Sequence, residues 1–237
     1  MCVISMIMCP IAPSQEVKTS KGPPETVKEA LLRHGISSDE QSLLLALGNS
    51  DPEVRGLAAI QLGVEKGKDA LPALLAALGA EKEPNAKVSM AAEVARLGDE
   101  TGIIDLRMIC DDKTTPAYIR LQAARRLQYL KDDYCYETVE GLAATAPDPD
   151  SRIGALYLLT NVESMSKRDT RKVRGLVVRA LGDSDVRVRV AASNQIVLIG
   201  KKSDLPFLER AAGAEKDTDA RSSMERDLET LRQKWGP

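Results

Sequence analysis

Apolar residues recur along the chain at the spacing of one helix face, and they do so in a unit that repeats. The clearest copy covers residues 51–63 and reads D-P-E-V-R-G-L-A-A-I-Q-L-G. Its apolar positions, three and four residues apart, predict an amphipathic helix. Asp51 can cap the start of that helix, Pro52 suits its first turn, and Gly63 is expected to end it in a left-handed conformation.

Five further segments carry the same pattern. One basic residue per copy serves as a marker, and successive markers stand 32 to 35 residues apart. The markers are Arg55, Lys87, Arg120, Arg152, Arg187 and Arg221. The later copies are expected to have caps at Asp148, Asp183 and Asp217, prolines at first helical positions at Pro84, Pro116 and Pro149, and terminal glycines at Gly98 and Gly200. A steady period of this length indicates a repeat array.

A shorter apolar helix is predicted beside each copy, at residues 39–48, 68–79, 100–110, 133–145, 169–182 and 203–213. No segment alternates apolar and polar residues for long enough to predict a sheet. The sequence therefore predicts an all-α solenoid of about six helix pairs, with a further helix at residues 24–34 that covers the first pair. Residues 24–237 would form this single domain, after an apolar and proline-rich tail at residues 1–23.

Three segments resemble HEAT repeats of the short bacterial type, which are related to the phycobilisome-lyase HEAT-like family. They are V-R-G-L-A-A at residues 54–59, I-R-L-Q-A-A at residues 119–124 and D-S-D-V-R at residues 183–187. The likeness extends over residues 39–235. It departs from long HEAT units, whose period is ~40–47 residues, and Pro116 replaces the acid of the third copy. The resemblance implies a superhelix whose second helices line a concave binding surface.

Acidic and basic residues stand four apart near the start of most of the longer helices. Such a pair contributes only ~0.2–0.5 kcal/mol inside a helix. The resemblance implies that these side chains also pair between adjacent repeats, as a ladder that fixes their register. The ladder comprises Asp51, Arg55, Glu83, Lys87, Arg120, Asp148, Arg152, Asp183, Arg187, Asp217 and Arg221. A row of cations that grips a polyanion is the alternative, but the neighbouring acids favour the ladder.

Side chains of the second helices that lie outside the apolar stripe are the candidate partner contacts. They are Glu93, Arg96, Arg125, Gln128, Tyr157 and Arg189. The resemblance places them on the concave side, where a protein or peptide segment would bind. The predicted function is a non-enzymatic interaction scaffold that needs no cofactor and no metal.

Charge is nearly balanced, with 33 basic and 35 acidic residues, which argues against a general attraction to nucleic acid or anionic lipid. Residues 166–189 break this balance with eight basic residues against three acidic ones. A weak polyanion site in this basic block is an alternative function, although solvated helix faces carry such runs routinely.

Little in the sequence indicates catalysis. The single histidine, His34, stands at a predicted helix C-terminus, where a polar or cationic side chain is favourable. One histidine cannot supply the repeated His-Glu pairs with which deoxyhypusine hydroxylases, another HEAT-like family, bind iron. Aromatic residues make up only 3% of the chain, too few for a base-stacking cleft like that of HEAT-like DNA glycosylases. A HEAT-like lyase, or a lyase-chaperone subunit acting with a partner, is the alternative that stays open.

Cys110 and Cys135 fall in apolar helices and form no C-x-x-C pair, so the sequence favours two small buried thiols over a disulfide. They lie in the first helices of adjacent repeats, and a bridge is geometrically conceivable. Residues 1–12 are apolar and uncharged but too short to span a membrane. They resemble the apolar core of a secretion signal that lacks its basic start and its cleavage site, which favours export with a start assigned too late. A cytoplasmic protein with a loose apolar tail is the alternative.

Overall fold

The computed structural model describes residues 25–161 and 170–235, and this part of the chain is helical and contains no strand. A short helix, α1 (Val27–Arg33), precedes six helix pairs. The pairs, here repeats 1 to 6, are α2 (Glu40–Ala46) with α3 (Pro52–Lys66), α4 (Leu71–Ala80) with α5 (Pro84–Arg96), α6 (Glu100–Asp111) with α7 (Ala117–Tyr129), α8 (Tyr136–Thr145) with α9 (Pro149–Leu159), α11 (Thr170–Ala180) with α12 (Val186–Ile199), and α13 (Leu205–Ala214) with α14 (Thr218–Trp235). Single 3-10 turns, η1 (Gly67–Ala70) and η2 (Lys202–Asp204), lead into α4 and α13.

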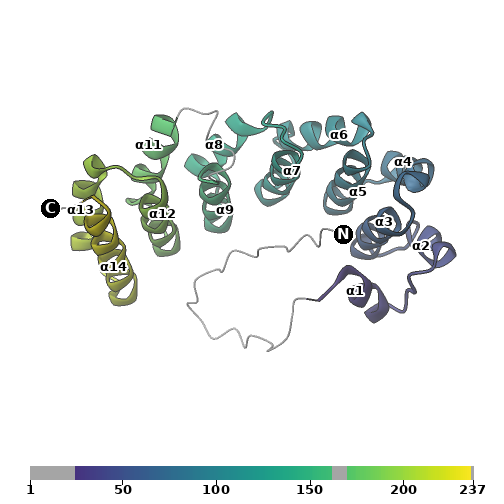
Figure 1. Ribbon diagram of the computed structural model, residues 1–237, viewed down its shortest axis with the longest axis horizontal. Coiled ribbons are helices and arrows are strands. Elements are labelled where there is room, and N and C mark those ends of the chain that lie inside the picture. Colours follow the sequence, from purple (N-terminus) through teal and green to yellow (C-terminus); the bar gives the residue numbers. More distant parts are fainter. Residues whose placement is uncertain (1–24, 162–169, 236–237) are drawn as a thin grey trace.

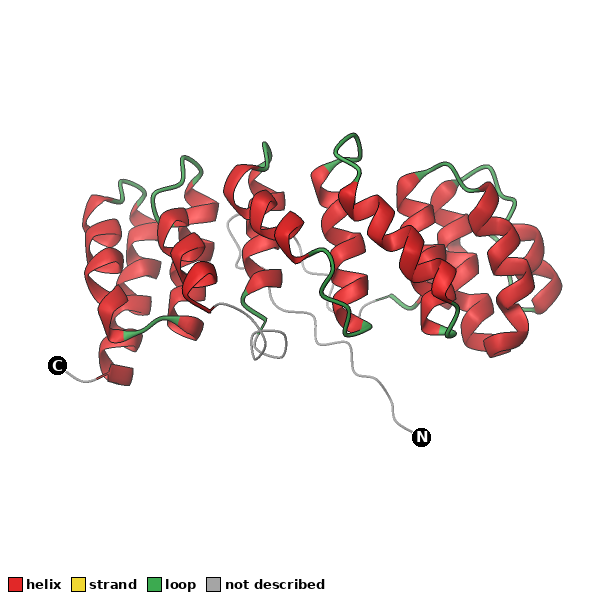
Figure 2. Cartoon of the chain, turned by 90° about the horizontal axis from the view of Figure 1, so that it is seen from above, coloured by secondary structure: helices red, strands yellow, loops and turns green. Residues whose placement is uncertain are grey.

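The six pairs stack side by side into an arch (Figure 1). The first helices lie along its outer side, with α6, α8 and α11 at the top of the view and α2 and α13 at its two ends, and the second helices lie along its inner side. Helix α1 packs against α3 at one end. Seen from above, the described chain consists of helices joined by short loops (Figure 2). The predicted all-α solenoid is confirmed.

The second helices begin where the sequence predicts, for the expected physical reason. Asp51 accepts a hydrogen bond from the backbone N–H of Glu53 (2.9 Å), and Asp148 accepts one from Ser151 (2.7 Å). Pro52, Pro84 and Pro149 occupy first helical positions, where a missing N–H is harmless. Pro116 departs from the prediction, because it is itself the N-cap of α7.

The start of α12 lies two residues later than predicted. Asp185, and not Asp183, caps this helix by accepting the N–H of Arg187 (2.8 Å). The motif D-S-D offers two capping acids, and the packing of the repeat selects the second. Arg189 therefore stands where Arg55 and Arg152 stand in their repeats, four residues after the cap.

Only one of the three predicted terminal glycines ends its helix in the left-handed conformation. Gly98 does so, with a φ of 97°. Gly200 ends α12 with extended backbone, and Gly63 lies inside α3, which continues to Gly67. Gly63 is needed for a different reason, because a Cβ on it would lie 1.8 Å from Oε1 of Glu93 on α5. This glycine lets repeats 1 and 2 pack closely.

The core is a single run of small and aliphatic side chains through all six repeats. Ala58, Ala123, Ala155 and Ala192 are fully buried, each seven residues after the cap of its second helix. The largest buried side chains are Leu, Ile and Met, and no aromatic ring is buried in the described chain. Such a thin core suits a solenoid, in which each repeat contacts only its neighbours.

Candidate functional site

The second helices lie along the inner side of the arch (Figure 1), and they carry a stripe of exposed and half-buried polar residues. The stripe consists of polar residues two, six, nine or thirteen positions after the cap of a second helix that are not buried. On α7 these are Tyr118, Gln122, Arg125 and Tyr129, all exposed, with 49% of Tyr118 and 71% of Tyr129 accessible. We define the inner face as Asn85, Arg96, Tyr118, Gln122, Arg125, Tyr129, Asp150, Tyr157, Asn161, Arg187 and Asn194.

Adjacent repeats are joined by an arginine that bonds two turns at once. Nε of Arg55 donates to Glu81 at 2.6 Å and Nη2 donates to it at 2.8 Å. Nη1 of the same side chain donates to the carbonyls of Asn49 (2.8 Å) and Ser50 (3.1 Å). Arg55 thus connects the turn before its own helix to the turn before the second helix of the next repeat. We call this arrangement a rung.

Two further rungs join repeats 4 to 5 and 5 to 6. Arg152 donates twice to Asp183, both times at 2.9 Å, and also to the carbonyls of the turn before α9. Arg189 donates to Glu215 at 2.6 and 2.8 Å, and to the carbonyls of Asp183 and Ser184. Because Asp183 takes part in both rungs, repeats 4, 5 and 6 form one continuous network.

Two of the three rung acids, Glu81 and Glu215, are shielded and held in their anionic form. The side chains of Glu81 and Glu215 are only 3% and 2% exposed. The hydrogen bonds from Arg189 lower the pKa of Glu215 from 4.5 to about 2, and those from Arg55 lower the pKa of Glu81 in the same way. The same bonds raise the pKa of both arginines. Two parallel N–H donors on one carboxylate are the strong geometry for such a pair.

The middle of the arch lacks rungs. Nζ of Lys87 lies 3.7 Å from Asp105 of the next repeat, and Nε of Arg120 donates to the carbonyl of Cys110 at 2.8 Å. Ala146 stands where Glu81 and Glu215 stand in their repeats, two residues before the cap, so Arg120 has no carboxylate to meet there.

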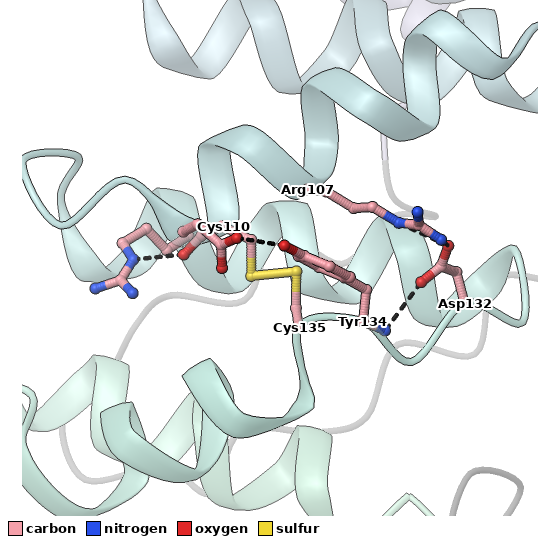
Figure 3. The surroundings of a disulfide bond; sticks show 7 residues. Arg107, Cys110, Asp132, Tyr134 and Cys135 are labelled. Carbon is pink, nitrogen blue, oxygen red and sulfur yellow. Dashed lines mark hydrogen bonds and ion pairs between the residues drawn. A yellow bond between two sulfur atoms is a disulfide. The ribbon is translucent and has the colours of Figure 1, made fainter.

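A disulfide joins repeats 3 and 4 at this place (Figure 3). It connects Cys110, near the end of α6, with Cys135, which precedes α8, and both residues are buried. Beside it, Tyr134 donates its hydroxyl hydrogen to Asp111 at 2.6 Å, and Arg107 pairs with Asp132 while lying 4.9 Å from the Tyr134 ring centre. The prediction of two free buried thiols is wrong about their bonding. A covalent bond and a polar cluster hold the junction between repeats 3 and 4, one of the two junctions that have no rung.

Comparison with protein families matches residues 40–128 and 137–229 to HEAT repeats. The chain belongs to the HEAT repeat family. HEAT repeats generally mediate protein–protein interactions and are typically non-enzymatic. The match does not single out the phycobilisome-lyase subtype. A search of curated proteins finds no sequence that matches the chain.

Of the acids predicted for the HEAT ladder, Asp183 is a rung acceptor, whereas the other two rung acceptors, Glu81 and Glu215, were not predicted. Asp51, Asp148 and Asp217 cap their helices, and Arg187 pairs with the exposed Asp150 (2.8 Å) and with its own cap, Asp185 (3.3 Å). Glu83 precedes α5 without a side-chain cap bond, and Arg221 donates to the carbonyl of Glu215. The acceptors are Glu81, Asp183 and Glu215, and the donors are Arg55, Arg152 and Arg189. Each acceptor lies two residues before a cap, a regularity that an alignment on the caps would have revealed.

Three of the six predicted partner contacts lie elsewhere than on the inner face. Glu93 is buried between α3 and α5, Gln128 donates to the carbonyl of Leu158 at 3.2 Å, and Arg189 forms a rung. Arg96, Arg125 and Tyr157 do lie on the inner face, where their role in binding stays a prediction. Tyr118, Gln122 and Tyr129 were not predicted, although they occupy the same positions after the cap.

Most described cations of the basic block form ion pairs within the HEAT array. Lys172 pairs with Glu140 (2.5 Å), Arg174 with Asp204 (2.9 Å), Arg187 with Asp150 and Arg189 with Glu215. Lys167 and Arg168 lie outside the described residues. Each of these four cations thus has an acidic partner on another element, and weak binding of a polyanion at residues 166–189 stays an alternative prediction.

His34 is exposed at the C-cap of α1, as expected for a residue that meets helix carbonyls. Within residues 25–161 and 170–235, no group of three or more His, Cys, Asp or Glu side chains is arranged to hold a metal ion. In the same ranges, no helix has the length and apolar character that crossing a bilayer requires.

Proposed function

We propose that this HEAT repeat protein is a non-enzymatic scaffold that binds an extended segment of a protein partner along its inner face. The proposal rests on the exposed tyrosines at the centre of that face. Tyr118 and Tyr129 stand eleven residues apart on α7 with Arg125 between them, and Tyr157 follows on α9. Tyrosine and arginine are enriched among the residues that dominate protein–protein binding energy.

Amide side chains surround these tyrosines. Asn85, Gln122 and Asn194 occur on the second helices α5, α7 and α12, and Asn161 follows the end of α9. An amide can donate to and accept from a peptide backbone at the same time. A row of amides with rigid aromatic rings between them suits an extended chain whose side chains pack against the rings.

The test places a photo-crosslinking amino acid at position 118 or 129, and at position 108 on the outer side as a control. Met108 is exposed on α6, so all three positions are accessible to solvent. A partner that binds the inner face is expected to be crosslinked from positions 118 and 129 and not from position 108. The same partner should be lost from the variant Tyr118→Ala/Arg125→Ala/Tyr129→Ala, while helicity and thermal unfolding stay unchanged. Crosslinking only from position 108, or full retention by the triple variant, contradicts the proposal.

A further inference from the structure

A groove of about 560 Å³ opens between the last turns of α11 and α13, on the outer side of repeats 5 and 6. Its apolar part includes Val178, Leu181 and Ala211, and its rim carries Arg179, Arg210 and Lys216. Phe207 adds a ring that is 44% exposed. The volume lies within the ~300–1,000 Å³ typical of ligand-binding clefts.

The groove is positively charged. Glu215 is the one carboxylate among its lining residues, and it is fully engaged. Its oxygens accept from Arg189 at 2.6 and 2.8 Å and from the backbone N–H groups of Lys216 (2.8 Å) and Asp217 (3.1 Å). No ion pair of Arg179, Arg210 or Lys216 exists within the described parts of the chain. The guanidinium of Arg210 instead lies 5.8 Å from the centre of the Phe207 ring.

Repeat 2 provides an internal control for this groove. Residues 71–82 read L-P-A-L-L-A-A-L-G-A-E-K and residues 205–216 read L-P-F-L-E-R-A-A-G-A-E-K, identical at eight of twelve positions. Ala73 and Ala76 correspond to Phe207 and Arg210. In the preceding helices, L-A-L-G at residues 45–48 corresponds to R-A-L-G at residues 179–182, so Leu45 occupies the position that Arg179 has in the later copy.

Both copies build the same rung, Arg55–Glu81 in one and Arg189–Glu215 in the other. The rung therefore needs neither Phe207 nor the two arginines. Repeats 5 and 6 thus carry an aromatic ring and two guanidinium groups at positions where repeats 1 and 2 have Ala73, Leu45 and Ala76. Neither Arg179 nor Arg210 forms an ion pair with an acid in the described residues. Unpaired guanidinium groups beside an exposed ring fit a ligand that carries carboxylates and an apolar side chain.

We propose that this groove binds an acidic segment of a protein partner, with its carboxylates on Arg179, Arg210 and Lys216 and an apolar side chain against Phe207. The site is separate from the inner face, because it is built by the first helices and the turns that follow them. It gives the scaffold a second surface, selective for charge, beyond the polar inner face.

The test uses the full chain and three fluorescein-labelled octapeptides in fluorescence anisotropy. GDELFEDG is acidic with an apolar centre, GDESSEDG keeps the charge without the apolar centre, and GKKLFKKG reverses the charge. Wild type is expected to bind the first peptide at least ten times more tightly than either control, and added salt should weaken that binding. Arg179→Ala/Arg210→Ala should weaken it at least tenfold, and Phe207→Ala should abolish the preference for GDELFEDG over GDESSEDG.

Arg125→Ala, on the inner face, is the matched control and should leave peptide binding unchanged. Conversely, Arg179→Ala/Arg210→Ala should leave crosslinking from positions 118 and 129 unchanged, so that the two proposals fail separately. A cation in the last turn of a helix also stabilises that helix. If the double variant lowers Tm and retains wild-type affinity, that structural role suffices and the proposed site is overturned. Equal affinity for GDELFEDG and GDESSEDG, or no binding of GDELFEDG by wild type, overturns it as well.

Discussion

The junction between repeats 5 and 6 and the junction between repeats 3 and 4 are held by different chemistry. The first has a shielded bidentate ion pair, Arg189–Glu215, and the second has the disulfide Cys110–Cys135. In a solenoid each repeat contacts only its neighbours, so stability is approximately a sum of repeat and junction contributions. The comparison shows that, at the junction of repeats 3 and 4, a covalent bond stands where other junctions of the array have a rung.

The largest expected loss of stability comes from removing the arginine of a rung while its buried acid remains. Arg189→Ala leaves Glu215 buried and charged without its main partner, which should destabilise the protein by roughly 3 kcal/mol, the lower end of the range for such changes. Urea unfolding measures the loss, and hydrogen exchange should locate it in α12 to α14. Arg187→Ala is the control, because its pair with Asp150 is exposed and contributes ~0–1 kcal/mol. Equal effects of the two variants would refute the special role of the rung.

Removal of the disulfide should come next in size. The two cysteines lie 25 residues apart, and closing such a loop contributes ~2–4 kcal/mol. Cys110→Ala/Cys135→Ala should therefore lower stability by about that amount, with faster hydrogen exchange in α6 to α8. A reducing agent should lower the midpoint of urea unfolding of wild type and leave that of the double variant unchanged. The chain also contains Cys2 and Cys9, so the thiols must be assigned to positions. Thiol-specific labelling of both Cys110 and Cys135 in unfolded, non-reduced protein would show that the bond is absent.

Acid should weaken the rung-held junctions before the disulfide-held one. The folded pKa of Glu215 is depressed to about 2 from 4.5. Its contribution to stability is therefore complete above pH 4.5 and is lost as the pH falls towards 2. At pH 3 the loss from this group is about 2 kcal/mol, and Glu81 adds to it in the same direction. Unfolding measured from pH 6 to 3 should show this slope in wild type and a shallower one in Arg189→Ala.

The smallest effect should come from adding a rung where none exists. Ala146→Glu places a carboxylate two residues before the cap of α9, within the arrangement that Arg55 and Arg189 use. In the Cys110→Ala/Cys135→Ala background it should restore ~0.5–1.5 kcal/mol. A double-mutant cycle with Arg120→Ala measures the pair directly. A coupling energy of zero would mean that Arg120 cannot leave the carbonyl of Cys110.

Local patterns in the sequence were sufficient to predict the fold. Caps such as Asp51, prolines such as Pro84 and apolar stripes act within one helix, so their meaning can be inferred from a single segment. The partners of the rung arginines lie 26 to 31 residues away in the next repeat, and spacing within one helix does not reveal them. The predicted ladder therefore contained the donors Arg55 and Arg152 and the acceptor Asp183, but not the acceptors Glu81 and Glu215.

The remaining misses have related causes. D-S-D at residues 183–185 contains two capping acids, and only packing distinguishes them, so Arg187 was chosen in place of Arg189. The distance between Cys110 and Cys135 depends on how far one repeat is displaced from the next, which no single repeat encodes. The inner face could have been predicted more fully, because Tyr118 and Tyr129 stand at the same distances from their cap as Asn85 and Arg96 do from theirs.

The disulfide also limits how far the chain can be stretched. Its two cysteines enclose a segment that includes all of α7, so a pulling force applied to the ends of the protein bypasses that segment. At ~3.3–3.6 Å per extended residue, the oxidised chain has a contour length about 80 Å shorter than the reduced chain. Mechanical unravelling of the arch would therefore leave the polypeptide between the two cysteines slack until the bond is reduced.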